Sequence, residues 1–184
     1  MKRIIITGPK SSGKSNIGLR LSALLNVPFF DLDEVLENIY ARTYGRQLSF
    51  REIYRRHGEA TFRELELKAA KEVSQKENIL LSTGGTTFTL ENLRETLLPN
   101  SYVILLTNDP AILWDRTSRK GLPSYLAKSS DPQAEFYLRV EKVVEVVTPL
   151  AQMKLNTEEL SIEDVAQLLD VELQRRNISL TQEN

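Results

Sequence analysis

Residues 8–15 (GPKSSGKS) are the segment of this chain whose residue types and spacing point most directly to chemistry. They match the pattern G-x-x-x-x-G-K-[ST], a glycine-rich turn that wraps its backbone around phosphate oxygens. Side chains in place of Gly8 and Gly13 would obstruct that close approach. Lys14 is expected to reach the β- and γ-phosphates, and the hydroxyl of Ser15 is expected to contact Mg²⁺. This phosphate loop therefore predicts a site for ATP with Mg²⁺.

The backbone of the phosphate loop supplies the rest of the predicted nucleotide site. Its amides point inward at the start of a helix, where the helix dipole favours an anion. An incidental glycine turn is the alternative, but the loop falls between a predicted buried strand and a predicted helix, which is the context that the motif requires. The expected contacts to the phosphates are Ser11, Ser12, Gly13, Lys14, Ser15 and Asn16.

Two carboxylates, Asp31 and Asp33, follow a short apolar segment and are the candidates for metal and acid–base chemistry. We expect them to close a strand and, being two residues apart, to share one face of it beside the phosphate loop. Asp31 would then hold Mg²⁺, directly or through water, and Asp33 would accept the proton of an attacking hydroxyl. Helix capping by Asp33 is the alternative interpretation. No acidic residue follows the apolar residues 79–81, so the metal-side carboxylate must come from elsewhere in the chain.

These residues sit at the junctions of strands and helices that alternate along the chain. Short apolar runs bounded by turn residues predict five strands, and apolar residues at helical spacing predict the helices between them. The alternation predicts an α/β fold with a parallel sheet that is covered on both faces. Strands are expected at 4–6, 28–30, 79–81, 102–106 and 153–155, and helices at 14–25, 35–41, 50–56, 59–74, 90–98, from 109 onward, 132–147 and 161–173.

A single domain is expected to span residues 1–175, since a chain of 184 residues suits one sizeable core. Within it, residues 118–131 are polar, contain a glycine and a proline, and predict a mobile lid. A lid that closes over nucleotide would exclude water from phosphoryl transfer. Arg119 is the cation expected to reach the phosphates from this lid segment. The polar residues 176–184 are expected to form a frayed tail.

Composition limits the partners that the chain is expected to have. The formal net charge is −1, with no basic field for nucleic acid and no basic amphipathic stretch for a membrane surface. There is no cysteine, which excludes disulfides and thiolate chemistry, and the single His57 excludes a multi-histidine metal site. The first apolar run is too short for a signal peptide, and no run reaches transmembrane length. We therefore expect a cytoplasmic protein that acts on a small molecule as a monomer.

The order of several short motifs resembles that of the shikimate kinases. After the phosphate loop come FDLDE at 30–34, SFREI at 49–53, GEATFRELE at 58–66 and TGG at 83–85, at the intervals seen in that family. The Gly-Glu-x-x-Phe-Arg-x-x-Glu pattern after an Asp-x-Asp is the most diagnostic part. The resemblance implies a five-stranded parallel sheet of the nucleoside-monophosphate-kinase type. It also implies that ATP phosphorylates the 3-hydroxyl of shikimate, a step of aromatic amino-acid biosynthesis.

By position, the resemblance implies a role for each residue that matches a motif. It assigns phosphate and Mg²⁺ to Lys14 and Ser15, the metal also to Asp31, and the substrate hydroxyls and the base role to Asp33. Arg63 would hold the substrate carboxylate, Gly84 and Gly85 would present bare amides to the substrate, and Arg116 would lie over the adenine. Without the resemblance, Arg63 is more simply an ion-pair partner of Glu59 one helical turn away, and the glycine pair is a turn.

Four positions depart from the family pattern. Ser11 stands where the phosphate loop usually has a glycine, Thr86 replaces a third glycine, and Leu122 replaces the arginine that usually precedes the lid proline. Val143 occupies the position of a second arginine for the substrate carboxylate. Arg139, one helical turn before Val143 on the same face, is expected to replace that arginine in part.

Three functions are compatible with these observations. The first is a shikimate kinase with rearranged arginines, and the second is a related kinase that phosphorylates another hydroxylated small molecule, such as gluconate. The third is a non-catalytic, ATP-binding relative, which the intact Lys14, Asp31, Asp33 and Arg63 argue against. A nucleoside monophosphate kinase is disfavoured, because it needs a cluster of arginines for a second phosphorylated substrate.

Overall fold

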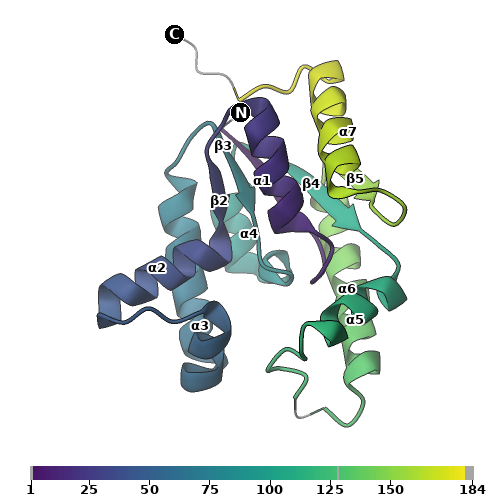
Figure 1. Cartoon of the computed structure of the whole chain (residues 1–184). Helices are drawn as coiled ribbons and strands as arrows, with labels where there is room; N and C mark the ends of the chain where they lie inside the picture. Colours follow the sequence, from purple (N-terminus) through teal and green to yellow (C-terminus); the bar gives the residue numbers. More distant parts are fainter. Residues whose placement is uncertain (1, 128, 181–184) are drawn as a thin grey trace.

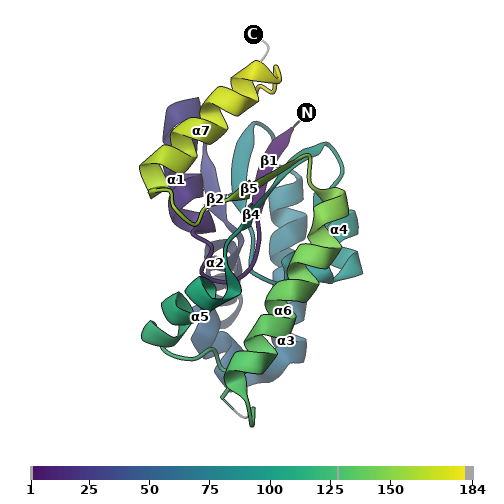
Figure 2. The same cartoon turned by 90° about the vertical axis from the view of Figure 1, so that its right-hand side faces the viewer.

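The computed structural model describes residues 2–127 and 129–180, and within them it contains one parallel sheet of five strands. The order across the sheet is β2-β3-β1-β4-β5, and every neighbouring pair of strands is parallel. Helices lie on both sides of the sheet (Figures 1 and 2), which confirms the predicted fold class. The strands are β1 (Arg3–Thr7), β2 (Phe29–Asp31), β3 (Ile79–Ser82), β4 (Ser101–Thr107) and β5 (Met153–Asn156).

Helices alternate with the strands in the predicted order. The described residues also contain two short 3₁₀ turns, which the sequence pattern missed because one turn is too short to produce a periodic apolar pattern. The α-helices are α1 (Lys14–Leu25), α2 (Leu32–Tyr44), α3 (Phe50–Ser74), α4 (Glu91–Leu97), α5 (Pro110–Arg119), α6 (Pro132–Val147) and α7 (Ile162–Arg175), and the 3₁₀ turns are η1 (Thr87–Thr89) and η2 (Thr148–Leu150).

Successive side chains of the central strand β1 point to opposite faces of the sheet, and each face carries its own layer of the core. Ile5 of β1 faces one side of the sheet and packs in a cluster with residues of α3, α4 and α6. Ile4 and Ile6 face the other side and pack with residues of α1 and α7. Figure 2 shows the sheet between these two sets of helices. Every residue of β1 is buried, as expected for a central strand of a parallel sheet that is covered on both faces.

Helix α3 bends sharply at Gly58. The backbone there has φ 77° and ψ −179°, which lies outside the helical region and joins two helical segments. A side chain would be strained at that φ, so glycine is what permits the change of direction. Sequence analysis predicted two separate helices here, at 50–56 and 59–74, and the bend accounts for the break between them. His57, just before the bend, is exposed and lies 2.8 Å from the hydroxyl of Tyr40.

The junction of β2 and α2 differs from the prediction. Asp31 is both the last residue of β2 and the N-cap of α2, and its Oδ1 accepts a 3.0 Å hydrogen bond from the backbone N–H of Asp33. Asp33 lies in the first turn of α2, where a carboxylate is favoured by the helix dipole. The expectation that both residues close the strand on one face is therefore wrong, and so is the alternative in which Asp33 is the cap.

The chain returns to the core after α7, as far as the structure describes it. Leu180 is buried in the apolar cluster that contains residues of α1 and α7, and Ile178 packs against the same cluster. The backbone N–H of Ile178 also donates to the carbonyl of Leu173 at 2.9 Å. The expectation of a frayed tail is therefore wrong for residues 176–180, while residues 181–184 lie outside the described part. Among the described helices, none is long and apolar enough to cross a membrane.

Candidate active site

The phosphate loop joins β1 to α1 at the carboxyl edge of the sheet. Gly8 has φ 143°, and a Cβ at this position would lie 2.2 Å from the carbonyl oxygen of Leu106 on β4. Gly13 has φ 92° and is the N-cap of α1, so both glycines of the motif are required by the backbone. Ser12 is buried, and its hydroxyl has no partner within the described residues, whereas Asn16 is exposed in the first turn of α1.

Ser11 connects the phosphate loop to helix α5. Its φ is 66°, in the left-handed region that usually favours glycine. The Ser11 hydroxyl lies 2.9 Å from the hydroxyl of Thr117, which is buried on α5, and the Ser11 carbonyl accepts from Arg116 at 3.5 Å. Arg116 thus lies next to the phosphate loop, and its predicted place over the adenine stays a prediction. Thr117 carries no motif and was missed by the sequence analysis.

Lys14 is buried within the phosphate loop. Its Nζ donates a 2.8 Å hydrogen bond to the carbonyl of Pro9, which holds the ammonium group inside the turn. Burial lowers the pKa of Lys14 to about 8, an effect that the carboxylate of Asp33 opposes and the charge of Lys10 reinforces. A phosphate group bound in the loop would place a negative charge beside this ammonium group and so favour its charged form.

Oxygen ligands for a divalent cation meet where α1 starts and β2 ends. The hydroxyl of Ser15 donates a 2.5 Å hydrogen bond to Oδ2 of Asp31. Asp31 is aligned with Ser82 on β3, whose buried hydroxyl has no hydrogen-bond partner in the described part of the chain. Mg²⁺ prefers oxygen ligands and keeps several of its waters, and an unpaired hydroxyl can hold such a water. The residues present therefore fit Mg²⁺, and Ser82 is one that sequence analysis missed.

Asp33 faces the space between the phosphate loop and the turn after β3. A Cβ at Gly84 would lie 3.5 Å from Oδ1 of Asp33, so the turn passes close to the carboxylate. Burial raises the pKa of Asp33 to about 7, and the charges of Asp31 and Glu66 act in the same direction. A carboxylate with this pKa can both accept a proton and release it near neutral pH.

A cavity of about 130 Å³ lies beside Asp33 and is called the Asp33 cavity below. Its walls come from the phosphate loop, the start of α2, α3, the turn after β3, the lid segment and α6. Gly84 and Gly85 line it, as the predicted substrate contacts should. Its aromatic lining is Phe50, Tyr54, Phe62, Tyr125 and Phe136, and its cations among the described residues are Lys10, Arg51, Arg63 and Arg139.

Arg63 lines the Asp33 cavity and also forms the predicted surface ion pair with Glu59, at 3.3 Å. Its shorter ion pair, 2.7 Å, is with Glu66, whose side chain is only 3% exposed. The second oxygen of Glu66 accepts a 2.7 Å hydrogen bond from the hydroxyl of Thr87. The Arg63 nitrogen that pairs with Glu59, Nη2, also donates to the hydroxyl of Thr86 at 3.4 Å. Glu66 thus fixes Arg63 toward the cavity, a role that the sequence alone did not reveal.

Arg139 and Val143 lie on the α6 wall of the same cavity. The structure brings Arg139 into the lining together with Arg63, as the prediction of a shared site requires. Arg139 is already engaged, however, since it donates to Oε1 of Glu135 at 2.7 and 3.1 Å. Its guanidinium also lies 4.4 Å from the ring centre of Tyr125. Val143 contributes a buried apolar side chain where the family pattern has an arginine.

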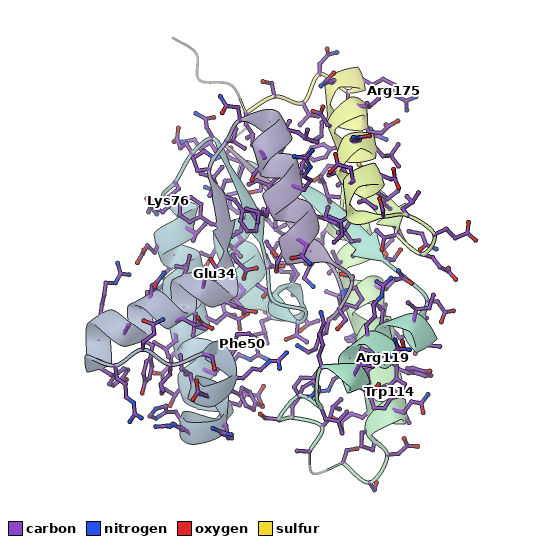
Figure 3. All side chains as sticks on the ribbon, in the orientation of Figure 1. Glu34, Phe50, Lys76, Trp114, Arg119 and Arg175 are labelled. Carbon is purple, nitrogen blue, oxygen red and sulfur yellow. The ribbon has the colours of Figure 1, made fainter. Side chains whose placement is uncertain are left out.

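The lid segment does not carry Arg119 to the phosphate loop. Arg119 is 77% exposed and pairs with Asp115 at 2.9 Å, and its contact with phosphate stays a prediction. Figure 3 shows Arg119 on α5 and Phe50 on α3, on opposite sides of the lower end of the molecule. Part of the segment is anchored, because Leu126 is fully buried against α5 and α6. Lys128, also within the predicted lid, lies outside the described residues.

The chain is similar in sequence to proteins named shikimate kinase. The chain matches the family model for shikimate kinase over residues 10–172. Shikimate kinase of Bacteroides thetaiotaomicron is 32% identical over 163 residues, which cover 87% of this chain and 89% of that one. Shikimate kinase of Aquifex aeolicus is 43% identical over a shorter stretch of 83 residues, 45% of this chain and 46% of that one.

The fold agrees with solved structures of the same name. Shikimate kinase from Acinetobacter baumannii, determined in complex with shikimate, superposes with a TM-score of 0.77 at 25% sequence identity. The superposition covers 96% of this chain and 94% of that one.

Proposed function

The chain belongs to the shikimate kinase family, and on that basis we propose that it transfers the γ-phosphoryl group of ATP to the 3-hydroxyl of shikimate. The observation that carries this proposal is the place of Asp33. Its carboxylate lines the Asp33 cavity together with Arg63 and interacts electrostatically with Lys14 of the phosphate loop. The proposed base and the proposed carboxylate-binding cation thus line one cavity, and the phosphate-binding lysine is close enough to interact with the base, which supports transfer to a hydroxy acid.

In the proposed reaction, Asp33 accepts the proton of the 3-hydroxyl as its oxygen attacks phosphorus. Lys14 stabilises the negative charge on the transferred group, and Arg63 holds the carboxylate of the acceptor in a two-pronged contact. Gly84 and Gly85 leave room for the acceptor close to the base. Mg²⁺, held by Ser15 and Asp31, would supply positive charge to the β- and γ-phosphates when bound. We further propose that residues 118–131 act as a lid over the nucleotide.

A second candidate is phosphorylation of a different hydroxy acid. It is favoured by the altered acceptor side of the Asp33 cavity, where Thr86 approaches a donor of Arg63 and Val143 offers no charge. One arginine holds a carboxylate less tightly than two, so the affinity for shikimate falls relative to that for an acceptor with further hydroxyl groups. Both candidates use the same base and the same phosphate loop.

The test is ADP release measured in a coupled assay with shikimate, gluconate and water as alternative acceptors. We expect turnover with shikimate that depends on ATP and Mg²⁺, and loss of that turnover in Asp33→Asn. Phosphorus NMR of the product identifies which hydroxyl carries the phosphate. Absence of turnover with shikimate at millimolar concentration, together with turnover of gluconate, would replace the first candidate by the second.

A further inference from the structure

The Asp33 cavity contains a cation that the proposed roles do not account for. Lys10 is the third residue of the phosphate loop, at a position that the motif leaves free. Its side chain lines the cavity, with Nζ 5.9 Å from the ring centre of Phe50. Arg63 and Arg139 each have a carboxylate partner, whereas Lys10 has no ion pair with any residue of the described ranges. Its charge is therefore available to a ligand.

The backbone places Lys10 close to the base. A Cβ added at Gly85 would lie 3.0 Å from the backbone nitrogen of Lys10, and one added at Gly84 would lie 3.5 Å from Oδ1 of Asp33. Lys10 therefore lies next to Gly85 and Asp33 lies next to Gly84, on the same turn. Because this turn has no side chains there, nothing from it separates the lysine from the carboxylate.

The charges around Lys10 favour an anionic ligand. Burial and the neighbouring Arg51 lower the pKa of Lys10, and Lys120 adds to this effect, while Asp33 opposes it. Lys10 in turn lowers the pKa of Lys14, so two lysines of one short loop repel each other. A negative group bound between them would relieve this repulsion and hold both in the charged form.

Two anionic groups enter this region in the proposed reaction, the carboxylate of the acceptor and the phosphoryl group in transfer. A carboxylate next to Lys10 would also lie near Asp33, and repulsion between like charges opposes that arrangement. The phosphoryl group, by contrast, must come near Asp33, because it bonds to the oxygen whose proton Asp33 accepts. Within the lid segment, Leu122 is apolar and Arg119 is paired with Asp115, so neither of these two residues supplies a free cation at this point.

We propose that Lys10 is a further catalytic residue, which contacts the phosphoryl group during its transfer from the side of the acceptor. Lys14 contacts the same group from the side of the nucleotide. The bond from phosphorus to the β–γ bridging oxygen breaks, the bond to the acceptor oxygen forms, and the acceptor proton passes to Asp33. Lys10 makes no covalent bond and loses no proton; it stabilises the charge of the equatorial oxygens. This role rests on the proposed function only for the identity of the acceptor.

The first test measures binding, and it needs no acceptor. Calorimetry gives the affinity of MgADP alone and of MgADP with aluminium fluoride, a planar mimic of the phosphoryl group. Aluminium fluoride should tighten the binding of MgADP to the wild type. In Lys10→Ala this gain should fall about tenfold to a hundredfold, the range of one charge-assisted hydrogen bond, with the affinity for MgADP alone nearly unchanged. Lys10→Arg should keep most of the gain.

Lys142→Ala is the control, because Lys142 is an exposed lysine on α6 that pairs with Glu145 and does not line the Asp33 cavity. It should leave the gain intact. An equal loss in Lys142→Ala would mean that removal of any lysine charge has this effect, and the proposal would be wrong. No gain in the wild type, or no loss in Lys10→Ala, would also overturn it.

The second test measures kinetics with the acceptor that the wild type turns over. Lys10→Ala should lower kcat about tenfold or more and leave the KM of the acceptor within about twofold, because the contact forms only during transfer. A rise in acceptor KM at unchanged kcat would show that Lys10 binds the acceptor instead, and would overturn the proposal. Failure of shikimate as an acceptor would affect the proposed function alone, since the binding test does not involve it.

Discussion

The hydroxyl of Ser15 donates a 2.5 Å hydrogen bond to one oxygen of Asp31, whose other oxygen caps α2 by accepting from the backbone of Asp33. The carboxylate of Asp31 therefore serves the proposed metal site and also fixes the helix turn that presents Asp33 to the cavity. Asp31 and Asp33 affect each other electrostatically, but their surroundings differ: Asp31 contacts Ser15, whereas Asp33 lines the Asp33 cavity.

Asp31→Asn and Asp33→Asn should both lower the rate of phosphoryl transfer, but with a different dependence on Mg²⁺. Loss of charge at Asp31 weakens the metal ligands, so we expect a raised requirement for Mg²⁺ and partial recovery at high Mg²⁺. Loss of the base at Asp33 should lower kcat about a hundredfold or more, without recovery, and leave the affinity for ATP nearly unchanged. A Mg²⁺ titration of kcat in both variants distinguishes these outcomes. Identical titration curves would contradict the separate roles.

The rate should depend on pH through two groups of the free enzyme. The pKa of Asp33 is raised to about 7, so kcat/KM should rise with pH up to that value as the base loses its proton. The pKa of Lys14 is lowered to about 8, so kcat/KM should fall at higher pH as this lysine loses its charge. Bound phosphate should move the alkaline limb upward in the profile of kcat. A constant kcat/KM between pH 5.5 and 7 would rule out Asp33 as the titrating base.

Arg63 and Arg139 should differ in their effect on the acceptor. Arg63→Ala should raise the KM of shikimate about tenfold to a hundredfold, the loss expected for one charge-assisted pair. Arg139→Ala should raise it less, since part of this arginine's bonding capacity is spent on Glu135. Arg63→Lys serves as a control that keeps the charge but not the two-pronged geometry. If Arg139→Ala leaves the KM unchanged, Arg139 only supports the wall beside Tyr125.

The lid segment, residues 118–131, should respond to nucleotide. Arg119 and Lys120 are exposed, so trypsin should cut after them in the free protein. A non-hydrolysable ATP analogue with Mg²⁺ should slow this cleavage several-fold as the segment closes. Cleavage after Arg175, far along the chain at the end of α7, provides the internal reference. Equal protection at both places would indicate general stabilisation rather than closure of a lid.

The sheet, the order of its helices and the phosphate loop could be predicted because each rests on a local signal. Buried β-branched runs and a fixed glycine spacing identify β1 and the loop regardless of their neighbours. The place of Asp33 could not be predicted, since it depends on a one- to two-residue difference in where β2 ends and α2 begins. Lys10 and Thr117 were missed for another reason: the residues that they contact lie on other elements, and no spacing in the sequence records those contacts. Glu66 lies one helical turn from Arg63, but its burial and its hydrogen bond with Thr87 do not follow from that spacing.

The bend at Gly58 has a consequence for how this enzyme could change its acceptor. It divides one wall of the Asp33 cavity into a segment before the bend, with Phe50, Arg51 and Tyr54, and a segment after it, with Arg63 and its partner Glu66. The earlier segment can therefore vary in shape and charge while the later one stays locked by its buried ion pair. Exchange of residues 45–57 between relatives, as a cassette, offers a direct route to altered selectivity with the phosphoryl-transfer machinery left in place.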